Sequence, residues 1–141
     1  MPHTPLRVGL AIPVAVICAW LFGAIHTALF AVPVNGPDPY FHVPTWLEPF
    51  AYTAQFLADL IPGVILGAIA RWRPGSLGFV VGFLSFLASA AIPGNQNVVL
   101  SATGLDWALT RGICWSVGAI SGTYLWQLWM PNNSLERTRE G

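Results

Sequence analysis

Four long apolar runs alternate along the chain with short polar stretches that contain prolines. Prolines at positions 33, 37, 39 and 44 exclude a continuous helix over residues 33–48. Most of the runs reach the roughly 20 residues that a helix needs to cross a bilayer, and the third lies at the lower limit. The pattern therefore predicts an all-α, polytopic membrane protein, a bundle of four transmembrane helices over about residues 8–32, 49–70, 76–92 and 106–129.

Local signals mark the ends of these predicted helices. Thr45 and Glu48 have the spacing of a capping box, and Pro49 is the alternative start signal for the second helix. Asp106 is the expected N-cap of the fourth. Residues 1–131 are expected to form a single transmembrane domain, and the polar residues 132–141 a disordered cytoplasmic tail.

Composition supports membrane insertion. Of the 141 residues, 55% are hydrophobic and only 9% are charged, whereas about a quarter are charged in soluble domains. The first apolar run is about twice as long as the core of a signal peptide, so it is expected to remain as the first span. The net charge is zero, which gives no argument for a nucleic-acid partner.

Arginine positions predict the orientation of the chain. With four crossings, one side of the membrane holds most of the arginines and the opposite side holds acidic residues. Because arginine is enriched in cytoplasmic loops, both termini are expected on the cytoplasmic side of the inner (plasma) membrane. The first group is Arg7, Arg71, Arg73, Arg137 and Arg139, and the second is Asp38, Glu48 and Asp106.

Asp59 is the centre of the candidate site. It lies near the middle of the second apolar run, where an aspartate costs about 2.5 to 3.5 kcal/mol on insertion and is expected to face away from lipid. Gln55, Asp59, Gly63 and Gly67 follow at intervals of four and therefore share one face of a helix. On this face Gln55 and Asp59 are polar, and Gly63 and Gly67 are small. Pro62 removes an amide just beyond Asp59, which favours a kink or a polar pocket.

Two further polar residues are expected at a similar depth. His26 in the first helix and Arg111 in the fourth both fall in the outer half of the bundle, counted at about 1.5 Å per residue. The hypothesis is an intramembrane polar cluster of Asp59, Gln55, Arg111 and His26 that opens outward. For Asp59, a structural pairing with Arg111 is favoured over proton or substrate coupling and over catalysis. Arg111 as an interfacial anchor and His26 as a satisfied core histidine are the simpler interpretations.

Glycines at intervals of four predict close helix packing, since small residues let two backbones approach in a membrane. The third helix carries such a face with serines beyond it, so it is expected at the centre of the bundle. The packing glycines are Gly63, Gly67, Gly78, Gly82, Gly118 and Gly122.

The sequence contains no HExxH, CxxC, phosphate-loop or dinucleotide motif, and the segment around Ser121 is not GxSxG. It therefore predicts no catalytic residue, no metal site, no cofactor and no enzymatic activity. The expected function is a structural or accessory membrane protein. A small proton-coupled secondary transporter or exporter using Asp59 is the alternative. The expected partners are the lipid bilayer and either further copies of the chain or a larger membrane complex.

Overall fold

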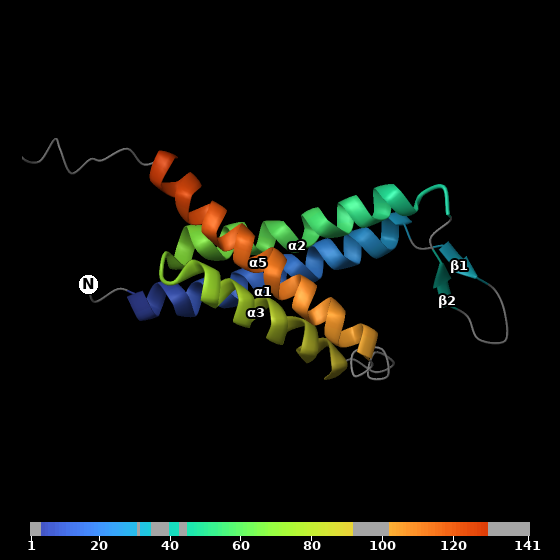
Figure 1. Ribbon diagram of the computed structural model, residues 1–141, viewed down its shortest axis with the longest axis horizontal. Helices are drawn as coiled ribbons and strands as arrows, with labels where there is room; N and C mark the ends of the chain where they lie inside the picture. Colours follow the sequence, from blue (N-terminus) through green and yellow to red (C-terminus); the bar gives the residue numbers. More distant parts are fainter. Residues whose placement is uncertain (1–3, 31, 35–39, 43–44, 92–101, 130–141) are drawn as a thin grey trace, which may run out of the picture.

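The computed structural model describes residues 4–30, 32–34, 40–42, 45–91 and 102–129. Within these ranges the chain forms four long helices, one short 3₁₀ turn and a two-stranded hairpin (Figure 1). The fold is helical, as the apolar runs predict. The predicted tail, residues 132–141, lies outside the described residues.

The first two helices, α1 (Thr4–Phe30) and α2 (Glu48–Ala70), lie side by side along the longest axis of the molecule (Figure 1). Strands β1 (Val32–Val34) and β2 (Tyr40–His42) lie between them in the chain and pair antiparallel. This hairpin falls in the stretch where prolines exclude a helix. The sequence predicts the interruption and gives no indication of the strands.

The start of α2 depends on proline. Leu47 is the N-cap and makes no side-chain capping bond, while Pro49 lies in the first turn. The capping box of Thr45 and Glu48 does not form, so the proline signal is the correct alternative. A proline suits this position because its missing amide hydrogen would have no helical acceptor there. Pro62 lies buried inside α2, which continues to Ala70 without a break.

The second pair of helices consists of α3 (Pro74–Ala88), extended by the 3₁₀ turn η1 (Ser89–Ala91), and α5 (Ala102–Trp129). Because α5 begins at Ala102, Asp106 lies inside the helix and is not its N-cap, so that prediction is wrong. Residues 102–105 contain no proline that would stop the helix. An N-cap preference of about 1 kcal/mol does not by itself fix where a helix begins.

The central helix of the bundle is α5. It packs along both α2 and α3, while α1 packs on the other side of α2 and α3 has few contacts with α2. Figure 1 shows α5 crossing α2 diagonally with α3 beside it. The expectation that the third helix occupies the centre is therefore wrong. The glycines on the small-residue face of that helix, Gly78 and Gly82, lie against α5.

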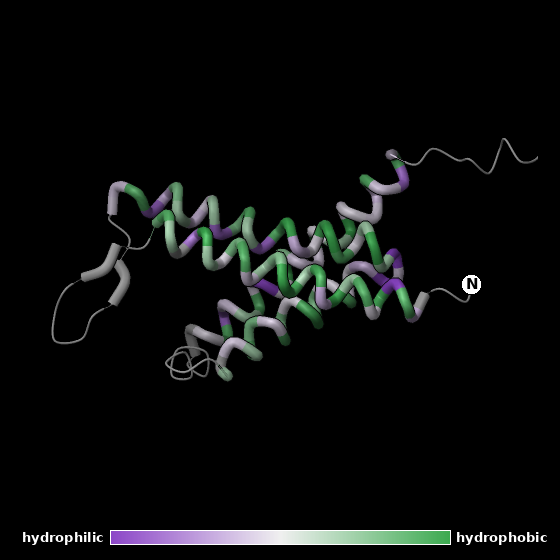
Figure 2. The backbone as a smooth tube through the Cα atoms, turned by 180° about the vertical axis from the view of Figure 1, so that it is seen from behind, coloured by the Kyte–Doolittle hydropathy of each residue, from purple (hydrophilic) through white to green (hydrophobic). Residues whose placement is uncertain are grey.

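Small side chains fill the interior and large ones cover the surface. Ala11, Ala15 and Ala19 of α1 are buried, as is Ala119 of α5. Figure 2 shows apolar residues distributed along the length of the helices. Trp115 and Leu66 are exceptions, because they are large side chains that are fully buried.

Two helices are long and apolar enough to cross a membrane by length and composition, over Pro5–Phe30 and Glu48–Ala70. A shorter apolar helix occupies Pro74–Ala88. The described part of the chain is thus mainly helical and contains two candidate membrane spans.

Candidate polar site between α2, α3 and α5

Asp59 lies at the centre of a hydrogen-bonded group between two helices. Arg111 of α5 donates from Nε to Oδ1 of Asp59 over 2.7 Å. Gln55, one turn earlier on α2, donates from Nε2 to Oδ2 of Asp59 over 3.0 Å. Both oxygens of the carboxylate therefore have a donor. Positions i and i+4 face the same side of a helix, which explains why Gln55 and Asp59 meet.

The pair is sheltered from the surface. Asp59 is only 6% exposed, and the side chain of Arg111 is 16% exposed. The Arg111 guanidinium carbon also lies 5.9 Å from the centre of the Phe86 ring, within the range of a cation–π contact. Since Phe86 belongs to α3, the ionic group links three helices.

Reciprocal glycine contacts bring α2 close enough to α5 for this pair to form. A Cβ atom at Gly63 would lie 2.5 Å from the carbonyl oxygen of Trp115, and one at Gly67 would overlap the backbone of Ala119. In the opposite direction, Cβ atoms at two glycines of α5 would overlap backbone atoms of α2. These are Gly118, against Leu60, and Gly122, against Val64.

The glycines of α3 contact the same face of α5. A Cβ atom at Gly78 would lie 2.5 Å from the carbonyl oxygen of Trp115, and one at Gly82 would lie 2.7 Å from Cγ of the Trp115 ring. All six glycines expected to mediate packing thus touch a neighbouring helix. The sequence does not reveal that α5 is the shared partner of both α2 and α3.

Trp115 is the largest fully buried side chain and lies one turn beyond Arg111. Its Nε1 has no hydrogen-bond partner among the described residues. Trp115, Gly118 and Gly122 are three and four residues apart and therefore share one face of a helix, but this spacing alone does not identify Trp115 as the centre of the core. A signal for its inward orientation is present in the sequence. Arg111 lies four residues before Trp115 and Gly118 three residues after it, so Trp115 shares the helix face that carries the polar and small residues.

His26 lies apart from this group. Its Nε2 is 3.0 Å from the carbonyl oxygen of Ala51, so that nitrogen carries the hydrogen, since a carbonyl oxygen only accepts. Its ring also packs on Phe30, with 5.1 Å between ring centres. Ala51 lies eight residues before Asp59, or about 12 Å along the helix. The structure therefore brings three of the four expected residues together, and His26 joins α1 to α2 elsewhere.

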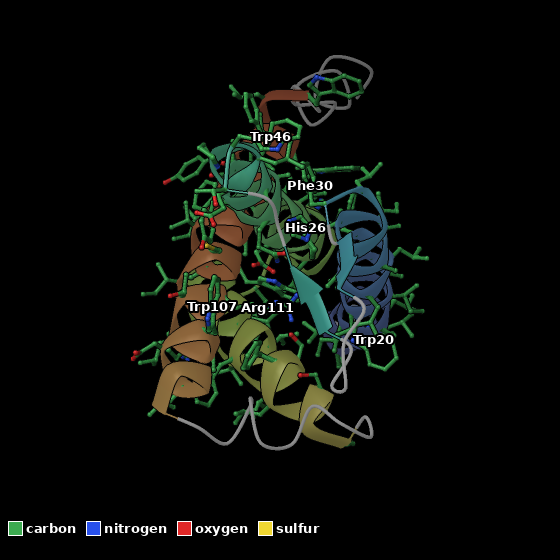
Figure 3. All side chains as sticks on the ribbon, turned by 90° about the vertical axis from the view of Figure 1, so that its right-hand side faces the viewer. Trp20, His26, Phe30, Trp46, Trp107 and Arg111 are labelled. Carbon is green, nitrogen blue, oxygen red and sulfur yellow. The ribbon has the colours of Figure 1, made fainter. Side chains whose placement is uncertain are left out.

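Figure 3 shows His26 and Arg111 between the helices, viewed from the end that carries the hairpin, with Trp20 on the outer side of α1. In this view His26 lies beside Phe30, whereas Arg111 lies farther from Phe30, on the side of Trp107.

The chemistry of this site is limited to ionic and hydrogen-bonding groups. Among the described residues, no three or more His, Cys, Asp or Glu side chains gather where they could hold a metal ion. Cys114 is buried with a free thiol, three residues from Arg111. The arrangement can lock two helices in register, and its carboxylate can accept a proton.

No protein-family model, no curated protein and no solved structure matches this chain.

Proposed function

We propose that this chain is an integral membrane protein with a structural or accessory role, in which the Asp59–Arg111 pair fixes the packing of the helices. The observation that carries the proposal is the inverted distribution of side-chain size. Alanines and glycines fill the helix contacts, and bulky apolar side chains point outward.

The exposed apolar surface extends over all four helices. Soluble monomers rarely expose contiguous apolar patches of more than a few hundred Å². Lipid chains would cover such a surface, and helices in a bilayer associate through small residues. Examples from each helix are Leu10, Ile17 and Leu29 of α1, Phe56 and Leu57 of α2, Val80 and Leu84 of α3, and Ile113, Val117 and Leu128 of α5.

The ionic group favours a structural role. An intramembrane carboxylate needs a partner inside the bundle, and here both oxygens of Asp59 accept hydrogen bonds from Arg111 and Gln55. Removing one partner of a buried pair leaves an uncompensated charge, which costs about 3 to 5 kcal/mol. The pair therefore selects the register in which α2 and α5 are assembled.

The proposed location is the inner (plasma) membrane, with the end that carries Arg7, Arg71 and Arg73 on the cytoplasmic side. Its partners are the bilayer and either further copies of this chain or the other subunits of a membrane complex. This role requires no enzymatic activity of the chain.

A second candidate function is a small proton-coupled transporter. It is supported by the partial exposure of Arg111 at 16%, because the ionic group is then not completely closed off from the surface. In this mechanism Asp59 would accept a proton and release Arg111. The charge change inside the bundle would be coupled to movement of α5 relative to α2.

The substitution Asp59→Asn separates the two functions. For the structural role we expect it to lower the melting temperature of the purified protein and to weaken its association with co-purifying subunits in a mild detergent. Resistance of the wild-type protein to alkaline carbonate extraction tests membrane insertion itself. An Asp59→Asn variant of unchanged stability that loses a pH-dependent flux in proteoliposomes would establish the transporter instead.

A further inference from the structure

Three exposed arginines lie at one end of the bundle. Arg7 belongs to the start of α1, Arg71 ends α2, and Arg73 immediately precedes α3. Figure 1 shows the start of α1 and the turn between α2 and α3 at the same end of the molecule. We call Arg7, Arg71 and Arg73 the arginine cluster.

The positive charges of the cluster influence one another. Burial lowers the pKa of the Arg71 guanidinium from its ordinary value, and the charge of Arg7 lowers that pKa further. Among the described carboxylates, Asp59 is engaged by Arg111, while Glu48 and Asp106 lie near the far ends of α2 and α5. Within the described part of the chain, the cluster therefore has no acidic partner.

Aromatic rings hold two of the guanidinium groups by their faces. The Arg71 guanidinium carbon lies 4.1 Å from the centre of the Trp126 ring, and its Nε donates to the carbonyl oxygen of Ala68 over 3.1 Å. The Arg73 guanidinium carbon lies 5.5 Å from the centre of the Trp72 ring. A cation–π contact of this kind does not use the terminal N–H groups of the guanidinium, which match the oxygens of a phosphate in a bidentate arrangement.

The backbone at this turn would favour glycine over arginine. Arg71 has φ 52° and Arg73 has φ 40°, the left-handed region that glycine occupies without penalty. Arginine at both positions therefore serves something other than backbone conformation. Guanidinium groups at this turn, beside Trp72 and Trp126, have the composition of a membrane–water interface.

We propose that the arginine cluster binds the phosphate group of an anionic phospholipid in the leaflet that this end of the bundle faces. The proposal rests on the proposed membrane location and adds a specific ligand to it. Charge complementarity selects the lipid, because three cations with no acidic partner among the described residues favour a headgroup that keeps its negative charge over a zwitterionic one.

The test compares phosphatidylglycerol with phosphatidylcholine. Full-length protein is purified in a mild detergent, each lipid is added, and the lipid bound is measured by native mass spectrometry. We expect preferential binding of phosphatidylglycerol and about thirtyfold weaker binding by the Arg71→Gln/Arg73→Gln variant, since each basic residue near an anionic surface contributes roughly a fivefold gain. Lysine at both positions keeps the charge without the planar fork and should restore only part of the binding.

The matched control is Arg137→Gln/Arg139→Gln, which removes the same charge elsewhere in the sequence and should keep the preference. A single Arg7→Gln variant, which leaves both arginine–tryptophan contacts in place, should weaken binding about fivefold. Equal binding of the two lipids, or equal losses in the tail control and the double variant, would overturn the proposal. Failure of the wild-type protein to insert into vesicles of either lipid would instead contradict the proposed membrane location.

Discussion

At the scale of single residues, the carboxylate of Asp59 accepts hydrogen bonds from two side chains, one on its own helix and one on another helix. Gln55 lies one turn away on the same helix, and Arg111 is 52 residues away in the chain. The first contact follows from helical periodicity and could be read from the sequence. The second required a depth estimate for α5. His26 was expected at a similar depth, but depth does not define the side of a helix to which a side chain points, and His26 faces Ala51.

The pairing of Asp59 with Arg111 can be measured by a double-mutant cycle. We expect Asp59→Asn and Arg111→Gln each to destabilise the protein by about 3 kcal/mol, because each leaves a buried partner without its counter-charge. The double variant should be less destabilised than the sum of the two, by about 0.5 to 3 kcal/mol. Unfolding in mixed micelles, followed by tryptophan fluorescence, gives these energies. Strictly additive losses would show that the two side chains do not interact energetically.

At the scale of the helices, glycine spacing predicted which faces pack but not which helices meet. The three glycine pairs have the same interval, so the pattern contains no information on partners. Partner choice depends on which backbones come into contact, and Gly63 of α2 and Gly78 of α3 both lie against the backbone of Trp115. Because the glycine faces of both α2 and α3 meet α5 at this residue, α5 is central. The N-cap expected at Asp106 failed because nothing before it stops the helix.

Substitutions at these glycines should separate the contacts from general helix propensity. Gly67→Ala and Gly122→Ala each place a methyl group against backbone of the opposite helix, and we expect a loss of about 1 to 3 kcal/mol. Gly9→Ala is the matched control, because a Cβ atom there meets nothing within 4 Å. It should be neutral or stabilising by up to about 1 kcal/mol. Equal effects at all three positions would contradict the proposed helix contacts.

At the scale of the whole molecule, the two ends of the bundle differ in charge. Arg7 and Arg71 interact electrostatically at one end, and Glu48 and Asp106 lie toward the other. The helical fold, and the two helices long and apolar enough to cross a membrane, could be predicted because they depend on run length and composition. The strand pairing of Val32 with His42 could not be predicted. The prolines in this part of the sequence exclude a helix, but they do not indicate which residues pair.

The asymmetry predicts how the chain is oriented. We expect a reporter fused to either terminus to remain on the cytoplasmic side, and a reporter inserted between α1 and α2 to be accessible from outside. Protease protection in spheroplasts and in inverted vesicles would measure both. Termini on opposite sides would exclude an even number of crossings and would separate Arg7 from Arg137 and Arg139.

The long separation between Asp59 and Arg111 has a consequence for biosynthesis. If the segments leave the ribosome and enter the bilayer in chain order, α2 arrives before its cationic counterpart has been translated. At about 5 to 20 residues per second, synthesis of the 52 residues that follow Asp59, up to and including Arg111, takes several seconds. During this interval Arg111 is absent, and of the two donors to Asp59 only the side-chain amide of Gln55 is present. Gln55 would therefore stabilise the carboxylate in the membrane until α5 is inserted.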